Sequence, residues 1–204
     1  MSHSRYVITI TRQFGSMGRP IARRMAEMLG IEYYDRDLVD QAAEKLNLPV
    51  SVINEVEEKA NSLAKSPFFR MASPLGSGTT ATQDKIFEAQ QNIIKFLAEK
   101  ETCVIVGRCA DFTLSEMENA IHIYIYASYE ARLEHCIKDL GMEEDEARRM
   151  MAAVDKARES YHMNFTGYAP DDKCHKDILI DSSLLGVEGT AEYLVELVKK
   201  KFGE

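Results

Sequence analysis

Four short segments of the chain are continuous runs rich in β-branched residues, without the alternation of polar and apolar positions that half-exposed strands show. Strands with this pattern are usually covered on both faces, as in a parallel sheet. Helix-length segments separate them, and such segments can serve as the crossovers that parallel strands require. We therefore expect an α/β fold with a central parallel sheet, whose strands lie at residues 6–11, 103–107, 121–126 and 177–180.

The other apolar residues mostly recur every three to four positions, which is typical of helices with one buried face. Residues 66–82 are instead rich in Ser, Gly, Pro and Thr and are expected to form a loop. Helices are expected after the glycines that follow the first strand, in two pieces within 35–65, and at 83–100, 129–140, 143–163 and 187–202. The positions of 83–100 that are expected to face the core are Ile86, Ile93, Ile94 and Leu97.

The composition is that of an ordinary folded protein, with 45% hydrophobic and 28% charged residues over 204 positions. The formal net charge of −8 argues against a general nucleic-acid-binding protein, which needs Lys and Arg to neutralise phosphates. The four cysteines have no CxxC spacing, the N-terminus does not resemble a secretion signal, and no apolar stretch could span a bilayer. We therefore expect a cytoplasmic protein without a membrane or nucleic-acid partner.

The segment directly after the first expected strand contains two glycines and leads straight into a helix. A turn of this kind points several backbone N–H groups at one place, where the helix dipole adds partial positive charge and favours an anion. The glycines allow a phosphate to approach the backbone closely. We name residues 12–20 the glycine loop. The residues in it that are expected to hold the phosphates of a nucleotide are Gly15, Ser16, Met17, Gly18 and Arg19.

The glycine loop departs from the usual order GxxxxGK[ST], in which the Lys reaches the outer phosphates and the hydroxyl binds Mg²⁺. Arg19 replaces the Lys and supplies its charge as a planar fork, whereas Pro20 has no hydroxyl. Thr11, Ser16 and a more distant carboxylate stay open as magnesium ligands, so the sequence does not identify the metal site. A second glycine-rich string, at 74–80, follows no expected strand and is interpreted as a connection without a phosphate site.

Two further arginines stand where a phosphate would need them. Arg108 follows Gly107 at the C-terminal end of an expected buried strand, the edge at which open α/β sheets bind ligands. Arg158 shares an expected helix with Asp155 and Tyr161, at spacings that put the three side chains on one face. The alternative explanation is a solvated helix face, on which an Asp155–Arg158 pair would contribute little to stability.

Five blocks of sequence, in order along nearly the whole chain, together resemble the cytidylate kinase-like family of P-loop nucleoside monophosphate kinases. The blocks are residues 8–19, 29–38, 104–111, 154–167 and 178–186. The first is similar to that family's phosphate loop, which commonly has Arg where Lys is usual. The second resembles the approach to the monophosphate site, the third the Gly-Arg-Asp block, the fourth the lid helix and the fifth the final strand.

The resemblance implies a three-layer P-loop fold in a single domain of residues 1–204. Its core would comprise residues 1–34 and 101–204. A helical insert at about 35–100 would bind the nucleoside monophosphate, and a helical lid at about 143–172 would cover the site.

The resemblance also implies an activity, the transfer of phosphate from ATP to a nucleoside monophosphate, with a CMP-like acceptor and with Mg²⁺ bridging the donor phosphates. The residues expected to act in catalysis are Arg19, Arg158 and Asp155. The residues expected to bind the acceptor are Asp35, Arg36, Arg108, Asp111 and Tyr161.

Two other functions stay open. A non-catalytic nucleotide-binding or regulatory protein would explain the missing Lys and the proline at position 20. A kinase for another small metabolite would explain residues 48–100, which are longer and more helical than in ordinary cytidylate kinases and lie where base selectivity would be built. The amphipathic helix at 83–100 could support a homodimer, or it could fold back on the core.

Overall fold

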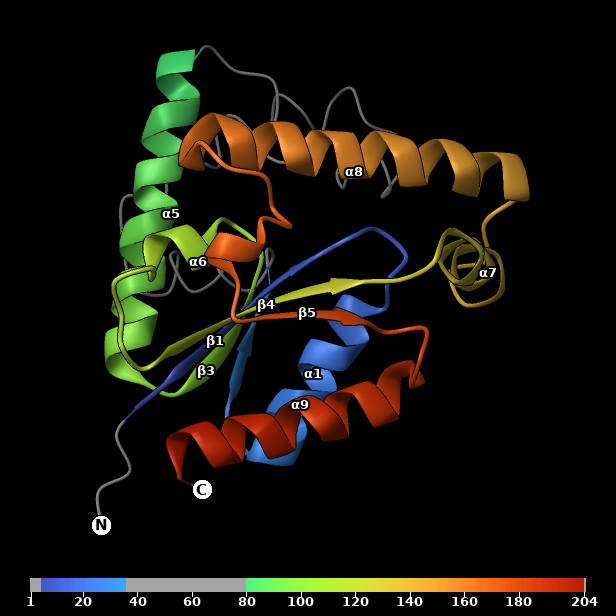
Figure 1. The fold of residues 1–204 in the computed structure, drawn as a ribbon. Coiled ribbons are helices and arrows are strands. Elements are labelled where there is room, and N and C mark those ends of the chain that lie inside the picture. The colour runs from blue at the N-terminus through green and yellow to red at the C-terminus, as the bar shows by residue number, and fades with distance from the viewer. Residues whose placement is uncertain (1–4, 36–79, 204) are drawn as a thin grey trace.

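The computed structural model describes residues 5–35 and 80–203 (Figure 1). The two helices expected within 35–65 and most of the loop expected at 66–82 lie outside these residues, as does Arg36. The described elements are β1 (Val7–Arg12), α1 (Gly18–Leu29), β2 (Glu32–Tyr34), α5 (Thr80–Lys100), β3 (Cys103–Val106), α6 (Ala110–Thr113), β4 (Ala120–Tyr126), α7 (Tyr129–Lys138), α8 (Glu144–Thr166), η1 (Lys173–His175), β5 (Ile178–Asp181) and α9 (Gly186–Phe202).

The strands form one parallel sheet in the order β2-β3-β1-β4-β5. In the centre of the sheet, Val7 is in register with Cys103 on one side and with Ala120 on the other. The four expected strands are confirmed to within one residue at each end. The fifth, β2, was missed because its three residues, of which two are tyrosines, are too short to show a pattern.

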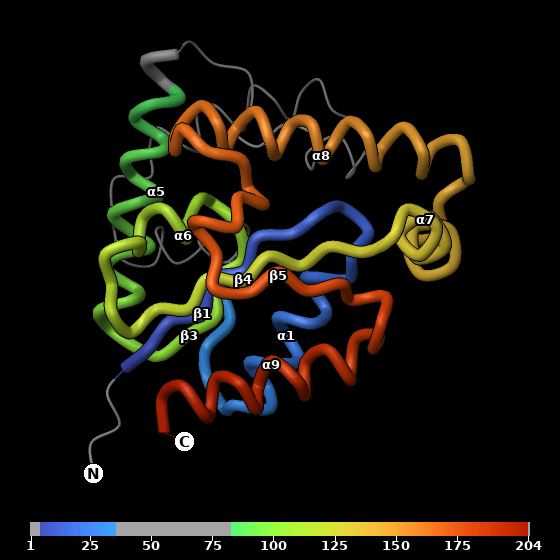
Figure 2. Tube along the Cα trace, in the orientation of Figure 1, coloured from blue at the N-terminus to red at the C-terminus, as the bar shows by residue number. Residues whose placement is uncertain are grey.

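Helices cover both faces of the sheet (Figures 1 and 2). On one face, α1 and α9 pack against inward side chains of β1, β3 and β4, such as Ile8, Ile10 and Ile123. On the other face, Ile94 of α5 and Ala110 of α6 pack against Val7 and the neighbouring strands. Both sets of alternating strand residues are therefore buried, which explains why the strands read as continuous apolar runs. The expected three-layer α/β fold is confirmed.

A third apolar cluster connects the glycine loop to α7 and α8. Phe14 is 3% exposed and packs with Cys136 of α7 and with Met151 and Val154 of α8. The long helix α8 crosses the molecule above the sheet, and its C-terminal part lies beside the N-terminal half of α5 (Figure 1). The cluster therefore ties the loop after β1 to a helix far away in the sequence.

The helices begin and end close to the expected residues, and the four core positions expected in α5 are all buried. Two short elements, α6 and η1, have no counterpart among the expected ones. No helix in residues 5–35 or 80–203 combines the length and the apolar character needed to cross a membrane.

Candidate functional site

Three residues other than glycine have a left-handed backbone within the described ranges: Met17 at φ 57°, Arg108 at φ 57° and Cys109 at φ 51°. Met17 belongs to the glycine loop after β1, and the other two belong to the turn after β3, which is the neighbouring strand. Side chains with a Cβ rarely adopt this conformation, and residues held in it are concentrated at functional sites. The strained positions therefore mark the carboxyl ends of β1 and β3 as the candidate site.

Hydrogen bonds anchor the glycine loop to the sheet. The Gln13 N–H donates to the Ile125 carbonyl at 3.1 Å. The buried Ser16 hydroxyl lies 3.0 Å from the Gln13 carbonyl and 3.1 Å from that of Ile125. The Ser182 hydroxyl donates to the Ser16 carbonyl at 2.7 Å. The side chain of Ser16 is thus part of the protein framework, and its hydroxyl is engaged inside the protein.

One backbone N–H group at the tip of the glycine loop donates a hydrogen bond to a carboxylate, and the next four along the chain have no acceptor among the described residues. The Phe14 N–H donates to Asp155 Oδ1 at 2.7 Å. In the part of the chain that the structure describes, the N–H groups of Gly15, Ser16, Met17 and Gly18 contact no acceptor. Because α1 begins at Gly18, these donors stand at a helix N-terminus, where an anion is favoured.

Gly15 has a separate reason to be glycine. Its φ is +78°, and a Cβ at this position would lie 3.0 Å from the Arg132 carbonyl and 3.1 Å from Cys136 Sγ. The loop therefore sits directly against α7, without space for a side chain.

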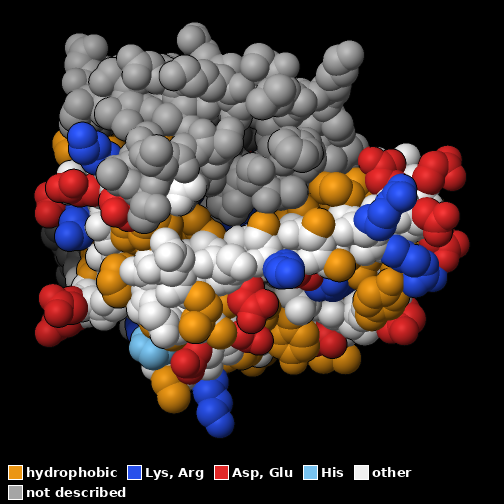
Figure 3. All heavy atoms as spheres, turned by 90° about the horizontal axis from the view of Figure 1, so that it is seen from above, with side chains coloured by type: hydrophobic (Ala, Val, Ile, Leu, Met, Phe, Trp, Pro, Cys, Tyr) orange, Lys and Arg blue, Asp and Glu red, His pale blue; other side chains and the backbone are white. Residues whose placement is uncertain are grey.

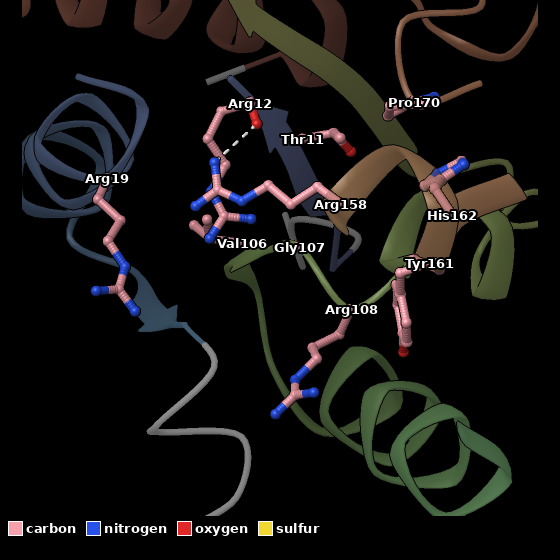
Figure 4. A pocket seen from close by; sticks show the side chains of 11 residues that line it. Thr11, Arg12, Arg19, Val106, Gly107, Arg108, Arg158, Tyr161, His162 and Pro170 are labelled. Atoms are coloured by element: carbon pink, nitrogen blue, oxygen red, sulfur yellow. Dashed lines mark hydrogen bonds between the residues drawn. The ribbon is translucent and has the colours of Figure 1, made fainter. Parts of the chain in front are cut away.

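Two cavities open beside the strained loops, and Figure 4 shows the residues that line the first of them. The strand-end cavity, of about 100 Å³, is lined by the turn after β3 and by α8, with Arg108 and Tyr161 among its residues. The glycine-loop cavity, of about 590 Å³, follows the glycine loop and α1 toward the start of α9. The residues that line both cavities are Arg12, Arg19 and Arg158. Positive charge is therefore concentrated where the two cavities meet.

Arg158 reaches this border from α8. Its Nη1 donates to the Arg12 carbonyl at 3.2 Å (Figure 4), and its guanidinium lies 5.9 Å from the centre of the Phe14 ring. Burial lowers the pKa of Arg158 to about 10, with Asp155 opposing the shift and the charge of Arg19 adding to it. The side chain remains a cation at neutral pH.

Asp155, one turn before Arg158, has both oxygens engaged. Oδ1 accepts from the Phe14 N–H at 2.7 Å and Oδ2 accepts from Arg132 Nη1 at 2.6 Å. The arginine is buried, with 8% of its side chain exposed. In this arrangement the carboxylate holds the glycine loop against α7 and α8 and is not directed at a reacting group.

Asp155→Asn is expected to lower the free energy of unfolding by about 2 kcal/mol, because one of the two donors loses its acceptor and buried Arg132 loses its counter-charge. Urea unfolding monitored by circular dichroism measures this effect. Glu144→Gln is the control, because it removes an exposed carboxylate from the same helix. Equal losses in both variants would contradict the anchoring role of Asp155.

Arg19 and Asp35, expected in catalysis and in acceptor binding, contact each other. Arg19 Nη2 lies 3.4 Å from Asp35 Oδ2, and the Tyr33 hydroxyl donates to the same oxygen at 3.2 Å. Burial, followed by the charge of Asp35, raises the pKa of Tyr33 to about 12, so the hydroxyl keeps its proton. Asp35 is 6% exposed. Its carboxylate therefore orients Arg19 at the end of β2.

Asp111, also expected to bind the acceptor, is enclosed in a buried cluster of polar side chains. His162 Nε2 lies 3.0 Å from its carboxylate, the Tyr168 hydroxyl lies at 3.3 Å, and Lys176 Nζ donates to the same oxygen. Burial alone would raise the pKa of Asp111, but hydrogen bonding to His162 and the charge of Lys176 lower it well below the usual value. The carboxylate joins α6 to α8 and to the segment before β5, and it lines neither cavity described above.

Arg108 and Tyr161 line the part of the strand-end cavity that is remote from Arg12 and Arg158, where the two cavities meet (Figure 4). The guanidinium of Arg108 extends away from those of Arg12 and Arg158 (Figure 4). The Tyr161 hydroxyl donates to buried Gln90 of α5 at 3.2 Å. Tyr161 also contacts Phe87 of α5, with ring centres 6.2 Å apart. The cavity therefore has the aromatic ring of Tyr161 in its lining, and contacts with α5 hold that ring in place.

The residues that the structure describes do not form a resident magnesium site. Within the described ranges, no group of three His, Cys, Asp or Glu side chains could hold a metal. The Ser16 hydroxyl is engaged inside the protein, and Asp35 and Asp155 are each paired with an arginine. Thr11, which lines the strand-end cavity, is the remaining hydroxyl of the three candidates named from the sequence. It would be a single ligand, and Mg²⁺ needs six.

Four residues of the site were not selected from the sequence: Arg12, Arg132, His162 and Lys176. Arg12 carried a usable signal, since it is the first residue of the glycine loop and directly follows a buried strand. Lys176 carried none, because a lysine two residues before a short strand is ordinarily exposed.

The chain was compared with known proteins. The family model described as the cytidylate kinase-like family matches residues 7–184. No match was found among curated proteins. The crystal structure of an uncharacterized protein from Eubacterium ventriosum ATCC 27560 is similar, with 26% sequence identity and a TM-score of 0.71, over 96% of this chain and 99% of that chain.

Two kinases share the fold at lower identity. Shikimate kinase from Bacteroides thetaiotaomicron is 14% identical with a TM-score of 0.53, over 98% of this chain and 99% of its own. A gluconokinase from Sinorhizobium meliloti 1021 is 13% identical with a TM-score of 0.52, over 98% of both chains. These identities show a common architecture alone. The family match, in contrast, spans most of the sequence and both strained loops, and the chain therefore belongs to the cytidylate kinase-like family.

Proposed function

We propose that the protein transfers a phosphoryl group from ATP to a nucleoside monophosphate, and that CMP is the preferred acceptor. The observation that carries this proposal is the meeting of two cavities at Arg12, Arg19 and Arg158. Phosphoryl transfer asks for alignment of two ligands and for positive charge over the transferred group. Family membership supports the same class of reaction.

The donor phosphates would occupy the glycine-loop cavity. The open N–H groups of residues 15–18 and the N-terminus of α1 suit an anion there. We expect ATP to arrive as its magnesium complex, because phosphates and waters supply most of the ligands of Mg²⁺ in kinases. Arg19 would add charge at the outer phosphates, in the place of the usual Lys.

The acceptor would occupy the strand-end cavity, with its anionic group toward Arg108. An acceptor oxygen would form a bond to the γ-phosphorus while the bond to the β–γ bridging oxygen breaks, leaving ADP. Any proton on the acceptor oxygen would pass to water. Arg158 would neutralise charge on the transferred oxygens, which is the role for which an arginine is most effective.

The aromatic ring of Tyr161 in the lining of this cavity supports a flat acceptor such as a nucleobase. The proteins named shikimate kinase and gluconokinase among the fold neighbours make a metabolite acceptor the alternative to test. Arg36, which the sequence suggests as an acceptor ligand, stays a prediction.

A coupled assay of ADP release tests the proposal, with ATP, Mg²⁺ and a panel of CMP, dCMP, UMP, AMP, shikimate and gluconate. The expected result is turnover that depends on a nucleoside monophosphate and is highest with CMP. Turnover with a metabolite alone would replace the acceptor but keep the reaction class. ATP binding by calorimetry without transfer to any acceptor would instead favour the non-catalytic nucleotide-binding protein. That alternative is supported by Pro20 and by the lack of a magnesium site among the described residues.

A further inference from the structure

The side chain of Arg12, the last residue of β1, passes directly over two glycines. A Cβ on Gly18 would lie 2.8 Å from the Cβ of Arg12, and a Cβ on Gly107 would lie 2.5 Å from its Nη1. Both distances are shorter than the contacts that Cβ atoms make in proteins. The side chain therefore starts beside the glycine loop and ends over the turn after β3. It explains why position 18, whose φ is not left-handed, must be glycine.

Asp35, which is paired with Arg19, acts on the guanidinium of Arg12 through its charge. Within residues 5–35 and 80–203, no carboxylate lies at ion-pair distance from it. Burial lowers its pKa well below the usual value, and the charges of Arg158 and Arg19 lower it further. A half-buried cation beside two others is unfavourable unless an anion compensates it. A framework arginine would be expected to have a carboxylate within reach, as Arg132 has in Asp155.

Arg12 also occupies the border of both cavities, and its backbone carbonyl accepts from Arg158. We propose that the Arg12 guanidinium binds the phosphoryl group at the border between the donor and acceptor cavities. The absence of a side chain at Gly107 leaves the space that this guanidinium needs to reach the phosphoryl group. This inference rests on the proposed function and adds a ligand-binding residue to the same site. The ligand class is the terminal phosphate of a polyphosphate.

Binding of tripolyphosphate and of ATP, measured by calorimetry, tests the role of Arg12. Arg12→Met is expected to weaken both about 10- to 100-fold, which is the range for losing a charged hydrogen-bonding partner. Arg12→Lys should recover part of the affinity, because it restores the charge without the planar fork of donors. Arg148→Met removes an exposed, paired arginine of α8 and should leave the affinity unchanged.

A double-mutant cycle tests the role of Gly107. Gly107→Ala in the wild-type protein should weaken tripolyphosphate binding, because the new Cβ displaces the guanidinium. The same substitution in the Arg12→Met protein should have no further effect on binding, since nothing remains to be displaced. Backbone strain from an alanine at φ +81° lowers thermal stability equally in both backgrounds, so it is measured separately by thermal unfolding.

The outcomes separate this inference from the proposed function. If the wild-type protein binds neither tripolyphosphate nor ATP, both are overturned. If it binds them and Arg12→Met binds equally well, the role of Arg12 is overturned and the proposed function stands. If Gly107→Ala still weakens binding in the Arg12→Met background, the glycine acts through its neighbour Arg108, and its proposed link to Arg12 is overturned.

Discussion

Replacing Arg158 with methionine is expected to lower kcat by about 10³-fold or more, the range measured for arginines that neutralise a transferring phosphoryl group. Arg158 is delivered by α8 to the border of the two cavities, and burial with Asp155 close by fixes its position. Methionine keeps most of the stem that packs near Phe14 but removes the charge. The loss should fall on kcat more than on KM, because the charge acts most strongly as the phosphoryl group leaves.

Steady-state kinetics with the acceptor selected by the panel measure this effect. Arg148→Met is the matched control, from the same helix and with the same loss of charge. Arg148 pairs with Glu144 in the first turns of α8. Charges of both signs are mixed on the surface of the molecule (Figure 3). A fall of less than tenfold in Arg158→Met, with the protein folded, would assign the catalytic charge to another group.

Lys176→Met is expected to lower the free energy of unfolding by about 3–5 kcal/mol, the range for breaking one side of a buried ion pair. The Lys176 side chain is 0% exposed and that of Asp111 is 1% exposed. The variant would leave the carboxylate buried without its cation. Lys138→Met, which breaks an exposed pair with Glu134, should cost little, and Asp111→Asn combined with Lys176→Met should recover part of the loss.

The same cluster predicts how stability depends on pH. Because the folded pKa of Asp111 lies below its usual value of 3.8, the ionised carboxylate stabilises the fold fully above about pH 4, and this contribution is lost as the pH falls further. The difference in unfolding free energy between wild type and Asp111→Asn should therefore be largest near neutral pH and shrink in acid. A difference that stays constant from pH 7 to pH 3 would exclude an ionised Asp111 in the fold.

The sheet could be predicted because its strands are buried on both faces, so that composition alone reveals them. The glycine loop was equally accessible, since a strand, two glycines and a helix follow one another directly. Strand β2 was not, because three half-exposed residues carry no period and their pairing with β3 is set by the rest of the sheet. Short elements of this kind depend on tertiary contacts more than on local propensity.

The sequence indicated which arginines would lie at the candidate site, but it did not indicate the ion pairs that the carboxylates form. Arg19, Arg108 and Arg158 do line the cavities, since each stands at the end of a strand or on the face of a helix that points inward. The carboxylates behaved differently. Asp111 and Asp155 are both paired with cations distant in the sequence, and no spacing rule reveals a partner that only the fold brings near.

Asp155 and Arg158 contact the glycine loop from successive turns of one helix, through the Phe14 N–H and the Arg12 carbonyl. The coupling between these contacts is reciprocal. If docked α8 increases the affinity of the glycine loop for a ligand, bound ligand stabilises the docked position of α8 by the same free energy. Swinging α8 outward would therefore loosen a bound nucleotide at its phosphates.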